Sequence, residues 1–177
     1  MTVVVPDEFK YLYVTDEDHP IVKVPSEVLL GHAEEVERVT KRHQTVAENM
    51  VRIMRAAKGI GLAAPQIGLR ERIVVVSVEG RTTVIFNPRI TESSGTQVGE
   101  EGCLSIPGLY GDVERAANVV VEGLDRKGRE STWDMDGLAA RVVQHEIDHL
   151  DGVLFTEKVD PATLYWQHPS EKPERAE

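Results

Sequence analysis

Gln144-His145-Glu146-Ile147-Asp148-His149-Leu150 is the stretch around which this chain of 177 residues is organised. It contains the pattern His-Glu-x-x-His. On an α-helix, residues i and i+4 lie about 40° apart around the axis and roughly 6 Å apart along it, so His145 and His149 can hold one metal ion between them. Glu146 points about 100° away from His145, where its carboxylate can reach a water on that metal. The pattern predicts metal-assisted hydrolysis with Glu146 as general acid/base.

A plain alternative is a helix whose polar face carries two histidines without a metal. Histidine is scarce in this chain, with 6 residues in all, which disfavours a chance pairing at this spacing. The function of the stretch therefore depends on whether the rest of the chain supplies a further ligand.

The composition is that of one soluble globular domain. Hydrophobic residues make up 41% of the chain and charged residues 28%, and no apolar run approaches a transmembrane span. Residues 1–8 lack the basic region and the long apolar core of a secretory signal, so we expect a cytoplasmic protein. A net charge of −10 argues against nucleic acid as a partner. We expect a single catalytic domain over 1–160 and a polar, disordered tail over 161–177.

Two helices are predicted from the apolar spacing. A stripe repeating every three and four residues predicts a helix from about 34 to 57, and His43 falls on that stripe, which favours a structural histidine over a ligand. The helix of the metal motif should begin after Asp136 as its N-cap and end before Gly152.

The strands are predicted to form antiparallel units. Two β-branched runs, 72–78 and 82–90, form a hairpin, and one long strand over 113–124 turns back into 130–135. A last short strand is expected over 153–155. The fold class is therefore α+β, with antiparallel β units packed around a central metal-binding helix and a long N-terminal helix outside.

A catalytic metal site needs a third protein ligand and an open position for water. Cys103 is the best candidate, because it is the only cysteine and lies among turn-forming residues, and its thiolate would donate charge to the metal. From position alone, a small buried core thiol is an equally good interpretation. The other candidates are the carboxylates and four further histidines: His19, His32, His43 and His168.

Three motifs occur in order along the chain: Gly59-Ile60-Gly61-Leu62-Ala63-Ala64-Pro65-Gln66, Glu101-Gly102-Cys103-Leu104-Ser105 and Gln144-His145-Glu146-Ile147-Asp148-His149. Together they resemble the three signature motifs of the peptide deformylases, and the similarity runs from about His19 to Phe155. The resemblance implies removal of the formyl group from the N-terminal formylmethionine of nascent polypeptides, with release of formate. It also implies one divalent metal ion held by Cys103, His145 and His149. Fe(II) is then the native ion, and Zn, Ni or Co can take its place, although the residue types do not separate these metals.

The mechanism follows from this chemistry. The metal lowers the pKa of its water, and the resulting metal-bound hydroxide attacks the formyl carbon. By resemblance, the side-chain amide of Gln66 and the backbone N–H of Leu104 stabilise the oxyanion. Glu146 takes the proton of the water and passes it to the leaving amine. The alternatives are a specialised paralogue acting on other N-formyl compounds, a metallopeptidase that depends on neither Gln66 nor Cys103, and a noncatalytic metal protein.

The methionine side chain of such a substrate needs an apolar pocket. Ile60, Leu138 and Val142 are placed for it, although plain core packing is an equally good role for them. Gly61 should let the peptide backbone bind in extended form.

Charged residues are also expected around the metal. Glu101 is assigned to the substrate-binding group, and it is also expected to pair with Arg115 beside the metal loop. Asp148 lies near the C-terminal end of its helix, where a negative charge is disfavoured, so a basic partner is expected there.

The expected partner is an N-formylmethionyl peptide, and we expect a monomer that binds neither nucleic acid nor membranes. Many relatives have a basic C-terminal helix that can dock on the ribosome. Here residues 157–177 hold five acids, three bases and two late prolines, so any transient ribosome contact does not run through a basic tail. The first twenty residues are also longer and more acidic than the usual start of such proteins.

Overall fold

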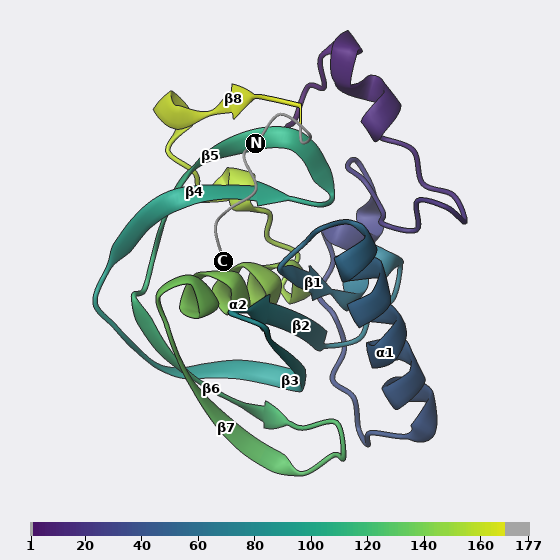
Figure 1. Ribbon diagram of the computed structural model, residues 1–177, viewed down its shortest axis with the longest axis vertical. Helices are drawn as coiled ribbons and strands as arrows, with labels where there is room; N and C mark the ends of the chain where they lie inside the picture. The colour runs from purple at the N-terminus through teal and green to yellow at the C-terminus, as the bar shows by residue number, and fades with distance from the viewer. Residues whose placement is uncertain (1, 169–177) are drawn as a thin grey trace.

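The computed structural model describes residues 2–168, and within them two antiparallel sheets lie on either side of helix α2, Gly137–Leu150 (Figure 1). The first sheet has five strands in the order β1-β2-β3-β6-β7, and the second has three in the order β4-β5-β8. This arrangement confirms the α+β class and the central helix. The strand bounds are β1 Gly61–Ala63, β2 Ile73–Val78, β3 Arg81–Ser94, β4 Gln97–Cys103, β5 Ile106–Arg115, β6 Asn118–Leu124, β7 Glu130–Asp136 and β8 Tyr165–Trp166.

The five-stranded sheet is covered by a helix on each face. Side chains alternate between the faces of a strand. On β2, Ile73 and Val75 belong to the core shared with helix α1, Lys41–Ala56, whereas Val74 and Val76 belong to the core shared with α2. A strand that is buried on both faces has no polar alternation. The apolar run that begins β2 is thus explained, and α1 is the expected long helix outside the sheet.

The three-stranded sheet packs its apolar face against the segment that follows α2. Ile106, Leu109 and Val113 of β5 share a core with Leu154 and Phe155. The segment before β1 forms two 3-10 helices, η1 Asp7–Leu12 and η2 Glu27–Leu29. This segment packs on the three-stranded sheet. The ring of Phe9 in η1 lies 5.1 Å from the ring of Trp166 in β8, centroid to centroid.

Helix α1 begins later than its periodicity predicts. Thr40 is its N-cap, and the backbone N–H of Thr40 donates to Nδ1 of His43 at 3.1 Å. His43 is therefore a structural capping residue. The segment before the helix is held by other partners, because the backbone N–H of Val36 donates to Oδ1 of Asn87 at 2.8 Å and Glu34 forms a bridge with Glu71. These tertiary bonds prevent the helix from extending back to residue 34.

Two strand predictions are wrong. The long strand expected over 113–124 is two strands in different sheets, because the chain leaves β5 at Arg115 and enters β6 at Asn118. The backbone of Ala116 in the break is bonded to the side-chain amide of Gln144 on α2, at 3.1 Å and 3.0 Å. The strand expected over 153–155 is replaced by the 3-10 helix η4, Phe155–Glu157. The hairpins β2–β3 and β6–β7 are confirmed.

Secondary structure continues past residue 160, where the sequence predicts the end of the catalytic domain. A 3-10 helix, η5 Pro161–Thr163, is followed by β8, in which Tyr165 and Trp166 pair with Tyr110 and Leu109 of β5. The first part of the expected disordered tail is therefore an edge strand, and residues 169–177 of that tail lie outside the described residues. Across residues 2–168, no helix combines the length and the apolar character needed to cross a membrane.

Candidate metal centre

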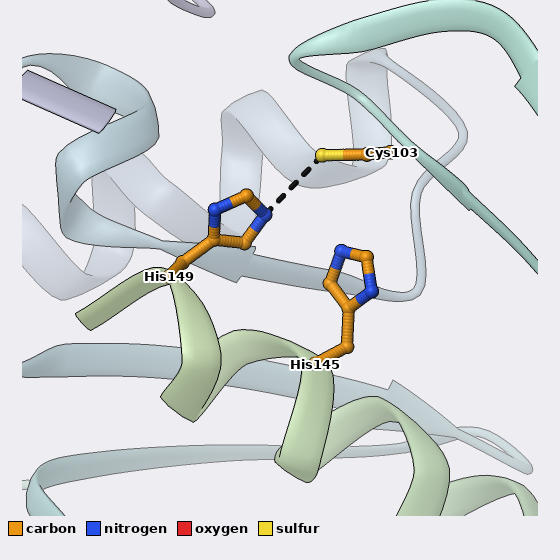
Figure 2. A group of neighbouring side chains, drawn as sticks. All are labelled: Cys103, His145 and His149. Atoms are coloured by element: carbon orange, nitrogen blue, oxygen red, sulfur yellow. Dashed lines mark hydrogen bonds between the residues drawn. The ribbon is translucent and has the colours of Figure 1, made fainter. Parts of the chain in front are cut away.

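Three potential ligands from two elements meet in one buried place. Cys103 ends β4, and His145 and His149 lie one turn apart on α2. Their ligand atoms all lie within 4.8 Å of one another, and Sγ of Cys103 is 3.2 Å from Nε2 of His149. Figure 2 shows the three side chains pointing toward one another. The third-ligand prediction for Cys103 agrees with this geometry, and within residues 2–168 none of His19, His32, His43 and His168 belongs to such a group.

The donor set fits a borderline or soft divalent metal ion. Burial alone would raise the pKa of the Cys103 thiol, but His149 and His145 outweigh burial and hold that pKa well below its usual value. Burial would lower the pKa of the His145 imidazole, but its hydrogen bonds to Cys103 and Glu101 raise that pKa well above its usual value. The thiolate is the form of cysteine that binds metals. A thiolate beside two imidazoles is a donor set that suits such an ion.

Glu146 lies beside the ligands without being one of them. The residue is 4% exposed, and its Oε2 has no hydrogen-bond partner within residues 2–168. Burial raises the pKa of its carboxyl to about 7, against the opposing effect of His145 and His149. A buried carboxylate with a free oxygen and a pKa near neutrality suits proton transfer to and from a reacting group.

Gly61 makes the position of Glu146 possible. A Cβ built on Gly61 would overlap Oε1 of Glu146 and would lie 2.7 Å from Cγ1 of Val142. Only a glycine lets β1 approach the helix this closely. The sequence also predicted that Gly61 lets a peptide backbone bind in extended form, and that stays a prediction; the structure shows that Glu146 fills the space where a side chain of residue 61 would lie.

The side chain of Gln66 is held in a fixed orientation next to Cys103. The backbone N–H of Ala63 donates to Oε1 of Gln66 at 2.9 Å, so the amide Nε2 faces the other way, toward Oγ of Ser105 at 3.2 Å and Sγ of Cys103 at 3.6 Å. Gln66 is 2% exposed and lies in the 3-10 helix η3, Ala64–Ile67. Leu104 directly follows Cys103, so its backbone belongs to the same turn. The amide donors named from the sequence are therefore both close to the ligand thiolate.

Glu101, which the sequence assigned to the substrate-binding group, is buried and bonded to one of the potential metal ligands in this structure. It is 6% exposed and its carboxylate accepts from Nδ1 of His145 at 2.9 Å. Arg115 donates to both carboxylate oxygens, at 2.9 Å from Nε and 3.0 Å from Nη2, which confirms the expected ion pair. Burial would raise the pKa of Glu101, but His145 and Arg115 lower it to about 2. Glu101 therefore orients the imidazole of His145 by accepting a hydrogen bond from its Nδ1.

The network of charges extends further than the sequence indicated. Asp148 has the expected basic partner, and in fact two of them, because Nη1 of Arg115 and Nζ of Lys158 both donate to its carboxylate. Arg141 was missed. It donates to Oε1 of Glu101 at 2.9 Å and is 6% exposed. An arginine one turn before His145, on the buried side of the helix, was the signal that could have revealed it.

The three apolar residues predicted to line a pocket differ in exposure. Val142 is 6% exposed and lies beside Gly61, whereas Ile60 and Leu138 are 41% and 39% exposed. Large apolar side chains that stay accessible to solvent are available to contact a ligand, and Ile60 and Leu138 meet that condition.

The comparisons with known proteins agree with this geometry. A sequence model of the family described as polypeptide deformylase matches residues 18–164. A protein of Syntrophomonas wolfei named peptide deformylase is 45% identical over 140 residues, which cover 79% of this chain and 92% of that protein. The crystal structure of the peptide deformylase from Thermus thermophilus superposes with a TM-score of 0.78 and 46% identity, covering 81% of this chain and 86% of the other. The peptide deformylase of Synechococcus elongatus, solved in complex with actinonin, has a TM-score of 0.77 and 40% identity over 79% of this chain and 78% of the other.

Proposed function

The chain belongs to the peptide deformylase family of enzymes, and we propose that it hydrolyses the formyl group from the N-terminal formylmethionine of nascent polypeptides, releasing formate and a free amine. The observation that carries the proposal is that three potential ligands, the amide of Gln66 and Glu146, whose Oε2 has no partner within residues 2–168, lie at one buried place. A site with these parts holds an amide carbonyl, activates water and protonates an amine, as hydrolysis of a formamide requires.

Cys103, His145 and His149 would hold the metal ion. When bound, the ion acts as a Lewis acid that lowers the pKa of water and polarises the formyl oxygen. We propose Fe(II) as the native ion, with Zn, Ni or Co able to replace it, because a thiolate with two imidazoles accepts all four.

Glu146 transfers the proton in this scheme. Its carboxylate takes a proton from the attacking water and delivers it to the nitrogen of the leaving amine. A pKa of about 7 suits both steps at neutral pH, because the group is neither too weak a base nor too weak an acid. Oε1 of Glu146 occupies the space that a side chain at position 61 would fill, so the glycine leaves room for this carboxylate.

Two amide groups stabilise the negative charge that develops on the formyl oxygen. Nε2 of Gln66 is preorganised, since Oε1 of the same side chain is already bonded to the backbone of Ala63. The backbone N–H of Leu104 is the second donor. Fixed donors need no reorganisation as charge develops, and removal of one such donor typically costs about 10²–10³-fold in kcat.

The methionine side chain of the substrate binds against Ile60, Leu138 and Val142. The first two are exposed enough to meet a ligand, and Val142 is buried beside Gly61. This surface confers selectivity for an unbranched apolar side chain at the first position of the peptide, because its burial is favourable and needs no polar partner.

Formate release from formyl-Met-Ala-Ser tests the proposal. The enzyme is prepared without oxygen and loaded with Fe(II) or Ni(II), and Glu146→Ala with the same measured metal content is the control. We expect wild-type activity to exceed the control by about 10²–10⁴-fold, the usual contribution of general acid–base catalysis. Equal rates for the two proteins would contradict the proposal. Cleavage of unformylated Met-Ala-Ser would indicate a peptidase, and release of formate only from other N-formyl compounds would indicate a different substrate.

A further inference from the structure

We propose that Arg141 is a positioning residue that holds helix α2 against the β4–β5 hairpin and so sets the distance between the ligands His145 and Cys103. The proposal rests on the metal site described under the proposed function. It concerns the assembly of the ligands and not the chemistry of the substrate, so metal binding alone can test it.

Arg141 lies four residues before His145, on the same side of α2. Its guanidinium reaches both strands of the hairpin. Nη1 donates to the carbonyl oxygen of Val113 on β5 at 2.8 Å and to that of Gly99 on β4 at 3.1 Å, and Nη2 lies 3.3 Å from the carbonyl oxygen of Gln97. A planar guanidinium offers five N–H donors in a fixed fork, whereas a lysine offers three donors on one nitrogen and cannot serve four acceptors. One side chain of the helix is thus bonded to the strand that ends in Cys103.

The hairpin is shaped to receive this guanidinium. A Cβ built on Gly99 would lie 3.2 Å from Nη2 and 3.4 Å from Cζ of Arg141, closer than most such contacts. The absence of a side chain at this position therefore lets the guanidinium lie against the backbone of β4. Gly99 and Arg141 form a matched pair, although they are far apart in the sequence.

Arg141 also completes the hydrogen bonding of Glu101. Oε1 of Glu101 accepts from Arg115 and Arg141, both at 2.9 Å, and Oε2 accepts from Arg115 at 3.0 Å and from Nδ1 of His145 at 2.9 Å. A carboxylate offers about four acceptor positions, so all of them are used. With its other positions filled, Glu101 has one orientation left, and that orientation directs Nε2 of His145 toward the metal.

The two arginines bracket the ligand from opposite directions. Arg141 reaches from α2 to the hairpin four residues before His145, and Arg115 reaches from the hairpin to Asp148 three residues after it. His149 has no comparable support, because its Nδ1 has no partner within residues 2–168. The orientation of the ligand set against the hairpin therefore depends on the support of His145.

Binding of Co(II) to the full-length protein, measured by competition with a chelator, tests the proposal. We expect Arg141→Met to bind Co(II) about 10–100-fold more weakly than wild type, the usual effect of losing support behind a ligand. The visible spectrum of the Co(II) protein should also change, because the thiolate and imidazole distances shift. Arg141→Lys should recover part of the affinity, since its ammonium can bind Glu101 but cannot serve the three carbonyl groups.

Gln97→Met is the matched control. Nε2 of Gln97 also ties β4 to α2, at 2.8 Å to the carbonyl oxygen of Gly137, but it does not touch Glu101. The Co(II) affinity of Gln97→Met should stay within twofold of wild type. An equal loss of affinity in Gln97→Met and Arg141→Met would overturn the proposal, because any loosening of the helix would then have the same effect.

Gly99→Ala keeps every charge and only displaces the guanidinium, so it should weaken Co(II) binding severalfold. If Arg141→Met does not fold, unchanged affinity and spectrum in Arg141→Lys and Gly99→Ala would overturn the proposal. None of these outcomes depends on which substrate the enzyme hydrolyses.

Discussion

The two sheets hold helix α2 by different forces. The five-stranded sheet contacts it through apolar side chains, and the core between them contains Ala140, Val143, Ile147 and Leu150 of the helix. The three-stranded sheet contacts it through charged and polar groups, namely the bonds of Arg141 and Arg115 and the group formed by Cys103 with the two histidines. Figure 1 shows the helix between the two.

The difference separates stability from geometry. Apolar burial is roughly proportional to area and has no preferred direction, so it stabilises the fold without setting any one angle. Hydrogen bonds and ion pairs have preferred distances and directions, but their net contribution to stability is small once desolvation is counted. We therefore expect the five-stranded side to determine whether α2 is folded, and the three-stranded side to determine where its ligands point.

Ile85→Ala breaks the apolar side and should have the largest effect. Ile85 is fully buried on β3, in the core shared with α2. Loss of three carbon atoms and the resulting cavity should lower the free energy of unfolding by about 2–5 kcal/mol. Urea denaturation measures it, and kcat per folded molecule should be unchanged. Val98→Ala, at a residue 66% exposed, should stay within about 0.5 kcal/mol of wild type. Lost turnover in stable, folded Ile85→Ala would contradict the separation.

Removal of the metal ion should weaken the contact between the three-stranded sheet and α2. At a metal concentration 100 times the dissociation constant, bound metal stabilises the folded state by about 2.7 kcal/mol, and chelation should remove that amount. The loss should not be uniform, because the ion connects only Cys103 to the helix. Amide hydrogen exchange should accelerate in β4 and β5 and remain slow in β2 and β3. Equal acceleration in all four strands would show that the two sides are not separable.

Gly61→Ala sharpens the comparison at the point where β1 meets Glu146. The added methyl group overlaps the carboxylate and crowds Val142, so the proton-transferring group must move. We expect kcat/KM to fall about tenfold, or about 1.4 kcal/mol, with a smaller change in stability. Gly31→Ala is the control, because a Cβ there would have 3.7 Å to its nearest neighbour. Undiminished kcat/KM in Gly61→Ala would mean that Glu146 tolerates displacement.

Tyr13→Phe should have the smallest effect. The Tyr13 hydroxyl is buried without a hydrogen-bond partner within residues 2–168, and burial and the nearby Cys103 raise its pKa. Its removal breaks no bond, so the free energy of unfolding should change by less than about 0.5 kcal/mol. Thermal unfolding of Tyr13→Ala, which also removes the ring, provides the comparison and should show a larger loss. A clear destabilisation by Tyr13→Phe alone would reveal a bond that this hydroxyl makes.

The local part of the site could be predicted from the sequence. The relation of His145, His149 and Glu146 follows from the period of a helix, and the hairpins β2–β3 and β6–β7 follow from β-branched runs separated by turn residues. Such patterns need no information about the rest of the chain. The α+β class and the central position of α2 followed from them.

Patterns of this kind fail where distant contacts override them. The run 113–124 has the composition of one strand, but the chain changes sheets at Ala116, where the side chain of Gln144 takes over its backbone bonds. Likewise, the sequence places residues 165 and 166 in a polar tail, but in the structure they pair with the edge of β5 as strand β8. Neither pairing has a local signal, because each is set by a partner more than 25 residues away.

The sequence by itself determined which chemistry the chain carries, because the ligands, the carboxylate and the amide donors are encoded as residue types within three short motifs. Only the tertiary structure decided how those groups are held. The bond of Glu101 to Nδ1 of His145 and the bonds of Arg141 between helix and hairpin are visible only in the folded chain. The physical reason is that a hydrogen bond requires both a narrow range of distances, a few tenths of an ångström wide, and a preferred angle. Groups from distant parts of the chain meet these requirements only once the two sheets have packed against α2.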